Sequence, residues 1–169
     1  VEEWRQVIAA LSMASMALGA VAAIGQTNIK RLLAYSSIGH MGYALVGLAA
    51  ADAAGIRAIM VYATLYMIMS IGTFAIVLMM KQKDRMVEQI SDLAGLGQRQ
   101  PMLALAMTIM MFSMAGIPPL AGFFGKLFIF QAAVNAQLYV LAVVGVLTSV
   151  IAASTPPATK RSTPPRMAG

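Results

Sequence analysis

One lysine in this sequence, Lys126, lies in a long apolar stretch that contains no other charged residue between Arg99 and Lys160. A charged lysine at the centre of a bilayer costs roughly 2.5–3.5 kcal/mol on insertion scales, so its presence needs a reason. An amine held away from water gives up its proton more readily than one in water, and Lys126 is therefore a candidate proton carrier. The alternative is a structural lysine that reaches an interface or pairs with a carboxylate outside this chain.

Lys126 follows an interruption in the apolar stretch, which reads "SMAGIPPLAGFFGK". Pro118 and Pro119 have no N–H to donate, so carbonyls one turn earlier lose their helical partners. Gly116 and Gly122 flank the pair and permit the backbone to turn. Irregular backbone at membrane depth is tolerated where it is buried in protein or lines a hydrated cavity, and broken helices mark ion pathways in transporters. We predict a broken helix that holds Lys126 beside a polar gap; a simple proline kink is the alternative.

A second group of candidate residues lies upstream, in "AYSSIGHMGYALVG". Helical spacing places Ser36, His40 and Tyr43 on one face. Histidine titrates near neutral pH, so His40 is a candidate proton relay, with the hydroxyls able to hold water. Tyr62 and Tyr66 lie one turn apart on the next apolar segment and join Tyr43 as possible pathway residues. Hydrogen bonding and close packing between helices explain the same residues, so both interpretations stay open.

The composition argues against several other kinds of site. The chain has no Cys and one His, which excludes disulfides, iron–sulfur ligation and a His-rich metal centre. No nucleophile–base pair, carboxylate pair or phosphate-binding glycine loop occurs, so we predict no catalytic residue, no metal site and no cofactor site in this chain. The net charge of +6 does not indicate nucleic-acid binding, because the basic residues other than Lys126 are confined to segments between or beside apolar runs.

The elements that must position these residues are apolar and long. Of the 169 residues, 60% are hydrophobic and 11% are charged, which is typical of a membrane protein. We predict an all-α membrane protein with about five transmembrane helices, the fourth of them discontinuous. The predicted helices cover residues 4–24, 32–51, 58–80, 102–134 (broken near 116–122) and 138–153. Residues 154–169 contain four prolines and small polar residues, so we expect a disordered tail.

The basic residues predict an orientation. If the helices alternate in direction, nine of the twelve Lys and Arg residues lie on one side and two on the other, with Lys126 on neither. Basic loops stay cytoplasmic, so the N-terminus should face the periplasm and the loop 81–101 the cytoplasm. This loop has Val87, Ile90, Leu93 and Leu96 at helix-like spacing, and forms either a short amphipathic helix at the interface or a solvated loop.

Two long motifs, "GQTNIKRLLAYSSIGHMGYALVGL" and "SMAGIPPLAGFFGKLFIF", resemble the antiporter-like subunits of proton-pumping NADH:quinone oxidoreductase, or respiratory complex I. The chain is most similar to the N-type subunit, the counterpart of mitochondrial subunit 2, and "ISDLAGLGQRQP" matches the pattern that precedes the broken helix there. The resemblance covers residues 4–153. The M-type subunit carries Glu where this chain has Lys126, and Mrp-type cation/proton antiporters share the ancestry.

The resemblance implies a larger fold with two inverted repeats of five helices, of which this chain would be the second. Lys126 matches the lysine that carries the proton on the broken helix. NADH, FMN, iron–sulfur clusters and quinone would be bound by other subunits, so this chain would hold part of a translocase without its redox site. The implied partners are the other membrane subunits and the lipid bilayer, and the implied location is the bacterial inner membrane.

The sequence departs from this family after "VLTSVIAA", where the family continues with a Tyr-rich helix end and a final span. Here a Pro-rich tail follows instead. The lysines and the membrane glutamate of the first repeat would lie upstream of residue 1, so we expect a fragment that does not pump protons alone. The alternatives are a subunit of an Mrp-type cation/proton antiporter and a truncated product that does not conduct.

Overall fold

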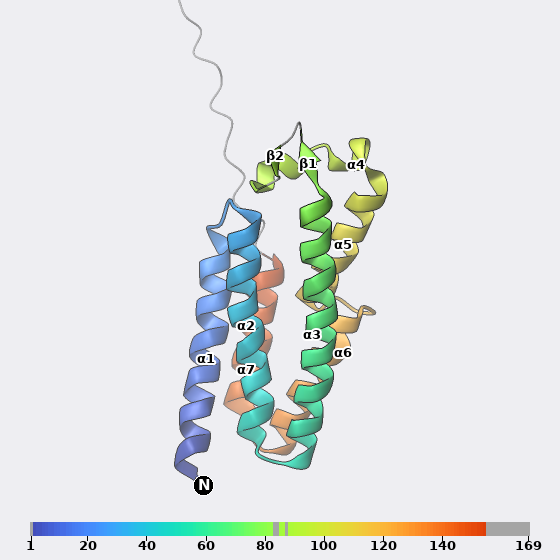
Figure 1. Cartoon of the computed structure of the whole chain (residues 1–169). Coiled ribbons are helices and arrows are strands. Elements are labelled where there is room, and N and C mark those ends of the chain that lie inside the picture. Colours follow the sequence, from blue (N-terminus) through green and yellow to red (C-terminus); the bar gives the residue numbers. More distant parts are fainter. Residues whose placement is uncertain (1, 83–84, 87, 155–169) are drawn as a thin grey trace, which may run out of the picture.

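The computed structural model describes residues 2–82, 85–86 and 88–154, and this part of the chain is mainly helical (Figure 1). Its helices are α1 (Glu2–Ile24), α2 (Ile29–Ala50), α3 (Ala53–Met79), α4 (Leu96–Arg99), α5 (Pro101–Ala115), α6 (Ala121–Asn135) and α7 (Tyr139–Ser154). Two short strands, β1 (Lys81–Gln82) and β2 (Arg85–Met86), and a 3-10 helix at Ile90–Leu93 lie between α3 and α4. The β1–β2 hairpin is a small addition to the all-α fold that we predicted.

Side-chain caps begin α2 and α3 earlier than the apolar runs alone predict. The Asn28 side chain accepts hydrogen bonds from the backbone N–H groups of Lys30 and Arg31. Asp52 accepts one from the backbone N–H of Gly55 at 2.6 Å. These oxygens satisfy donors that the first turn of a helix leaves unpaired, so each helix extends back to its cap.

Within the described residues, three helices, α1, α2 and α3, are long and apolar enough to cross a membrane, and α5 and α7 are shorter apolar helices. Their outward faces are apolar: Val7, Val21, Met67 and Ile71 are each more than 60% exposed. Large exposed apolar surfaces mark contact with lipid or with other proteins. The described residues thus form a helical membrane domain.

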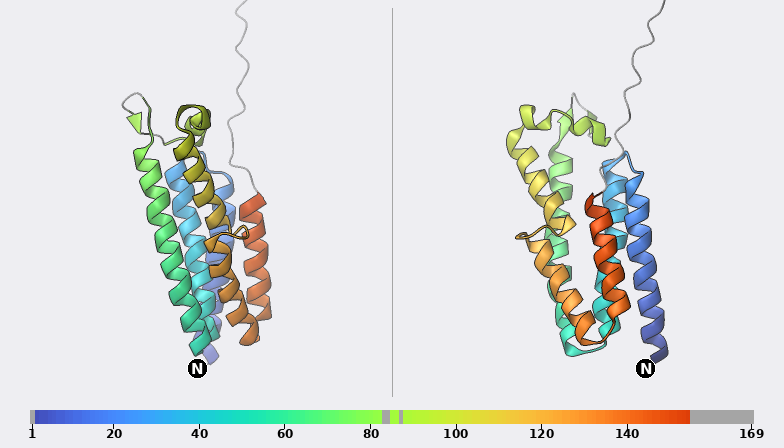
Figure 2. Two further views of the ribbon diagram at one scale, coloured as in Figure 1. Left: turned by 90° about the vertical axis from the view of Figure 1, so that its right-hand side faces the viewer. Right: turned by 180° about the vertical axis from the view of Figure 1, so that it is seen from behind.

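The predicted fourth helix is divided into α5 and α6, which follow one another down the bundle (Figure 2). Gly116 ends α5 with a left-handed backbone, at φ 86°. Pro118 and Pro119 lie in the connection, where neither residue can donate a helical hydrogen bond. The break is therefore present where the proline pair predicts it.

Two clusters of buried side chains hold the bundle together at different heights. One surrounds Ile129 of α6 and includes Met16 of α1 and Val46 of α2. The other contains Ile29 of α2 with side chains of α3 and α5, among them Met114. The helix break lies between these clusters, so α5 packs in one of them and α6 in the other.

The segment between α3 and α5 folds against the α1–α2 turn. The backbone N–H of Ile29 donates to the carbonyl of Glu88, and that of Ile90 donates to the carbonyl of Thr27, both at 2.8 Å. Lys30 Nζ also lies 2.9 Å from a Glu88 carboxylate oxygen. The segment is neither a single amphipathic helix nor a loop without structure, because backbone bonds to a distant turn set its shape.

The two ends of the bundle differ in charge. The α1–α2 turn, the β1–β2 hairpin and α4 lie at one end, which also holds Lys30, Arg31 and Arg99 (Figure 1). The α2–α3 connection and the start of α1, with Arg57 and Arg5, lie at the other. The loops predicted to lie on the same side of the membrane therefore lie at the same end of the bundle.

The end of the described chain needs one correction. We expected the tail to begin at Ser154, but this residue is the last of α7. The helix continues for almost one more turn after Val150 and Ile151, its last branched residues. Residues 155–169, and Val87 in the earlier segment, lie outside the described part of the structure.

Candidate functional site

Lys126 is buried on α6, where the residue is only 7% exposed. Its Nζ donates hydrogen bonds to the backbone carbonyl of Ala115, the last residue of α5, at 3.0 Å, and to Ser149 Oγ on α7, at 2.9 Å. The centroid of the Tyr43 ring on α2 lies 5.0 Å from Nζ, within range of a cation–π attraction. Three helices therefore hold the amine through neutral groups, and the side chain does not extend to a helix end.

The helix break makes one of these acceptors available. The last four carbonyls of an α-helix have no donor within the helix, so the carbonyl of Ala115 can bind an outside group. In a continuous helix, the same carbonyl would accept the N–H at position 119, which is a proline here and has none. The broken segment thus supplies the lysine with a hydrogen-bond acceptor in the middle of the bundle.

The two glycines at the break have different roles. A Cβ added to Gly116 would lie 3.0 Å from Lys126 Cδ and 3.2 Å from its Nζ, so the absent side chain leaves room for the lysine. Gly122 was predicted to lie in the break, but it belongs to the first turn of α6. Its N–H donates to Ser113 Oγ at 3.2 Å, and a Cβ there would overlap the Ser113 carbonyl. Gly122 therefore permits close approach of α5 and α6.

Tyr43 links α2 to α7 next to the lysine. Its hydroxyl donates to the carbonyl of Gly145 at 3.2 Å and lies 3.3 Å from Thr148 Oγ1. Phe130 packs against the Tyr43 ring edge-on, with an angle of 83° between the two ring planes. These contacts fix the ring in the orientation that it presents to Lys126.

His40 lies in an aromatic cluster between α2 and α3. Its Nδ1 is 2.6 Å from the Tyr62 hydroxyl, and its ring stacks on Tyr66 with centroids 4.7 Å apart. The ring of Tyr43 is 6.1 Å from that of His40. The structure thus gathers His40 and the three tyrosines predicted as possible pathway residues, and Lys126 contacts them through Tyr43. A relay and a packing role both remain consistent with this geometry.

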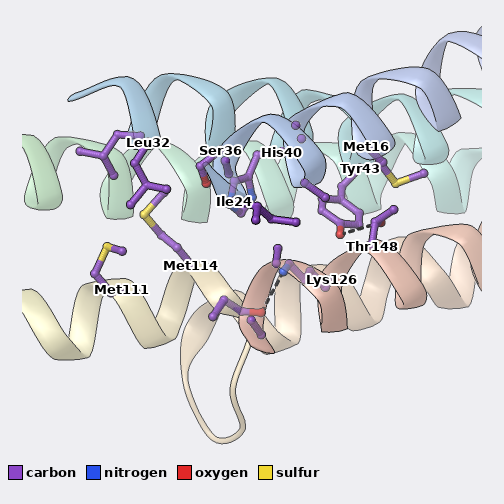
Figure 3. A pocket seen from close by; sticks show the side chains of 18 of the residues that line it. Met16, Ile24, Leu32, Ser36, His40, Tyr43, Met111, Met114, Lys126 and Thr148 are labelled. Carbon is purple, nitrogen blue, oxygen red and sulfur yellow. Dashed lines mark hydrogen bonds between the residues drawn. The ribbon is translucent and has the colours of Figure 1, made fainter. Parts of the chain in front are cut away.

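A cavity of about 590 Å³ lies beside these residues. Figure 3 shows Ser36, His40 and Tyr43 facing it from α2, and Lys126 facing it from the opposite side. Its walls continue past Leu32 and to the end of α7, so it extends from Lys126 toward the end of the bundle that carries the α1–α2 turn. Most of the lining is apolar, and its polar groups are concentrated around Lys126 and His40.

Sequence reasoning missed Ser149, which contributes one of the two hydrogen bonds of Lys126. It lies in "VLTSVIAA", where a hydroxyl on an apolar helix is a common packing residue. The available signal was the presence of a polar side chain in the middle of an apolar helix. Apart from Ser149, Thr148 and the residues at the helix ends, this helix has no polar side chain. Its partner could not be read from the sequence, because that depends on how α7 is rotated against α6.

No group of three or more His, Asp or Glu side chains that could bind a metal ion occurs within residues 2–82, 85–86 and 88–154. The neighbours of Lys126 offer two neutral oxygen acceptors and one ring face, and all three are directed at its ammonium group. This arrangement suits holding and exchanging a proton on the amine.

Comparison with known proteins places the chain in a family. A family profile described as "NADH:quinone oxidoreductase/Mrp antiporter, TM" matches residues 1–152. NADH-quinone oxidoreductase subunit N of Rhodospirillum rubrum is 60% identical over 152 residues, which cover 90% of this chain and 31% of that protein. The chain thus spans about a third of the length of such relatives.

Two solved structures share the fold. One is respiratory complex I from Thermus thermophilus with bound aureothin, in which a chain matches with a TM-score of 0.77 and 36% identity, covering 88% of this chain and 33% of that one. The other is the Mrp complex from Dietzia sp. DQ12-45-1b, with a TM-score of 0.76 and 26% identity, covering 89% of this chain and 28% of that one. The chain therefore belongs to the transmembrane family of NADH:quinone oxidoreductase and Mrp antiporter subunits, where its resemblance is to the N-type subunit of complex I.

Proposed function

We propose that this chain forms part of a proton-translocation channel in the membrane arm of a proton-pumping NADH:quinone oxidoreductase, with Lys126 as the proton carrier. The observation that carries the proposal is the environment of Lys126: a buried amine between two helix halves, held by neutral acceptors and facing a cavity. A buried lysine in a membrane domain is costly, and function is the usual reason for its presence.

The neutral surroundings favour a carrier over a structural ion pair. The six acidic residues of the chain occur at positions 2, 3, 52, 84, 88 and 92, all outside α5, α6 and α7. With a carboxylate as its partner, an amine that lost its proton would leave a buried anion behind, which is strongly unfavourable. With a carbonyl, a hydroxyl and a ring as partners, the amine can lose its proton without stranding a charge.

The proposal includes a position in the membrane. The chain would be a multi-pass part of the bacterial inner membrane, with α1, α2, α3, the α5–α6 pair and α7 as five spans of one antiporter-like repeat. The end with the α1–α2 turn and α4 would face the cytoplasm, because most basic residues belong to it. The cavity would then extend from Lys126 toward the cytoplasm.

His40 would have a secondary part in the same path. It lies across the cavity from Lys126, and its bond to Tyr62 holds the ring in place. Other membrane subunits of the complex and the lipid would cover the apolar outer faces, and NADH, FMN, iron–sulfur clusters and quinone would be bound by other subunits.

Substitution of Lys126 in the assembled complex tests the proposal. Lys126→Gln and Lys126→Arg should both lower the protons moved per NADH oxidised, because an amide cannot carry a proton and a guanidinium does not release one. Proton uptake and membrane potential are measured in inside-out vesicles beside NADH oxidation, with the assembled complex quantified on native gels. Lys30→Gln is the matched control, since it removes a lysine that is 40% exposed. Wild-type pumping by the Arg variant would show that Lys126 is not a proton carrier.

An Mrp-type cation/proton antiporter subunit is the second candidate, supported by the similarity to the Dietzia complex. The same lysine would then exchange protons against a cation without redox chemistry. Proton movement that requires Na⁺ and continues without NADH would favour this candidate. A membrane scaffold without an ion path is the third candidate, and it predicts that no Lys126 variant changes proton movement in any complex containing the chain.

A further inference from the structure

Ser149 was not predicted from the sequence, and in the proposed function it is one neutral acceptor of the Lys126 bond among others. Its Oγ lies 2.9 Å from Lys126 Nζ, at a distance typical of a bond from a charged donor. The residue is on α7, whereas the lysine is on α6 and its other oxygen acceptor ends α5. Ser149 is thus the contact that ties the amine to α7.

We propose that Ser149 is a positioning residue that holds Lys126 in both of its protonation states, an inference that rests on the proposed function. A serine hydroxyl both accepts and donates, whereas a backbone carbonyl only accepts. When Lys126 is charged, its N–H donates to Ser149 Oγ. When the amine is neutral, the Ser149 O–H rotates and donates to the free lone pair of Nζ. Ser149 itself neither gains nor loses a proton.

The other contacts of the amine cannot serve both states. The Ala115 carbonyl can only accept a hydrogen bond, and the face of the Tyr43 ring attracts the ammonium form through its quadrupole. Both therefore favour the charged amine. Without Ser149, the neutral amine would keep no donor among these three contacts and could rotate away from the position in which it receives the next proton.

The adjacent hydroxyl of Thr148 does not replace Ser149. It donates to backbone carbonyls of its own helix, at 2.9 Å from Val144 and 3.0 Å from Gly145, and faces the Tyr43 hydroxyl. The Thr148 hydroxyl is thus already hydrogen-bonded within α7 and to Tyr43 of α2. Both hydroxyls interact with the Tyr43 side chain, but Ser149 is the one that also bonds to Lys126.

Several titratable side chains lie near Lys126 on the helices packed against it. His40 and Tyr43 approach from α2, and Tyr62 and Tyr66 from α3. Between its first and last turns, α7 has no ionisable side chain, and α5 has none at all. A change in the pH profile near neutral pH on substitution of Ser149 therefore reports on the Lys126 site, since the other titratable side chain that Ser149 touches, Tyr43, is a phenol, which ordinarily titrates well above neutral pH.

The test compares Ser149→Ala, Ser149→Thr and the control Ser37→Ala in the assembled complex. Ser37 is a partly exposed serine that bonds to its own helix and does not contact Lys126, so its loss should leave pumping unchanged. Ser149→Ala should lower protons moved per NADH severalfold and shift the pH dependence of pumping by about one unit toward lower pH, because bonds from charged donors are stronger than neutral ones. Ser149→Thr keeps the hydroxyl and should restore the wild-type pH profile even if its added methyl lowers the rate.

Lys126→Gln is measured in parallel to separate the two proposals. If Lys126→Gln pumps normally, the proposed function is wrong. If Lys126→Gln fails to pump but Ser149→Ala keeps the wild-type yield and pH profile, only the role of Ser149 is wrong. A Ser149→Ala variant with reduced pumping and an unshifted pH profile would also overturn the inference, because it would indicate a packing defect at α7.

Discussion

Alanine substitutions at Gly116 and Gly95 distinguish the effect of backbone strain from the effect of displacing the Lys126 side chain. Both have left-handed backbones, with φ of 86° and 80°. Placing alanine in this region costs about 1–2 kcal/mol at either position. A Cβ at Gly95 would have no neighbour within 4 Å, whereas a Cβ at Gly116 would lie 3.0 Å from Lys126 Cδ. The two alanine variants should therefore be destabilised alike and differ in function.

The expected functional loss follows from the distances at the amine. Ordinary contact with a Cβ begins at 3.4 Å, so the Lys126 side chain must withdraw from Gly116→Ala by about 0.4 Å. Its bonds of 2.9 and 3.0 Å would lengthen beyond the usual range of about 2.7–3.2 Å. Losing roughly 1 kcal/mol from a charge-assisted bond corresponds to about a fivefold slower proton transfer.

The assay is proton uptake by inside-out vesicles at matched NADH oxidation, with thermal stability of the assembled complex measured for both variants. Gly116→Ala should pump several times less than Gly95→Ala at similar stability. Equal pumping by the two variants would refute the reasoning, since it would mean that the amine tolerates displacement or that the neighbouring backbone yields instead. Reduced pumping in Gly95→Ala alone would show that strain in the segment before α5 matters more than the lysine contact.

Two further predictions concern the helix packing and the aromatic cluster. Gly19→Ala should lower the stability of the assembled subunit by about 1–3 kcal/mol through overpacking, because the added Cβ would lie 2.5 Å from the backbone nitrogen of Gly39. Gly39→Ala should be tolerated, because its Cβ would meet its nearest atom at 3.8 Å. Equal melting temperatures of the two variants would contradict this prediction. His40→Ala should reduce pumping only partly, and Tyr62→Phe, which removes the hydroxyl bonded to His40, should give a similar or smaller loss. Abolished pumping in a normally assembled His40→Ala complex would instead make His40 a principal proton carrier.

The features that could be predicted from the sequence are those with local causes. A proline pair interrupts a helix wherever the chain places it, so the break between α5 and α6 follows from Pro118 and Pro119 alone. The burial of Lys126 follows from the absence of other charges around it, since no simple placement brings it to a helix end. The α1–α2 turn is likewise marked by a polar cap, Asn28, before an apolar run.

The features that could not be predicted depend on how helices are set against one another. Ser149 meets Lys126 only because α7 is rotated and shifted to one particular position against α6. Gly122 resembles a turn glycine in sequence, yet its role comes from the approach of Ser113 on α5. The segment after α3 has helix-like spacing, but backbone bonds to Thr27 and Ile29 override it. Tertiary contacts therefore decide these positions, and local propensity does not.

The end of α5 at Ala115 also has an electrostatic consequence. The aligned peptide groups of a helix give its C-terminus a partial negative charge of roughly half an electron, spread over the last carbonyls. The Lys126 ammonium lies at this end, bonded to the final carbonyl of α5. The macrodipole is thus a fractional counter-charge that cannot itself be protonated. Small movements of α5 along its axis would then raise or lower the potential at the amine, which gives a mechanical displacement in the bundle a direct way to control proton binding.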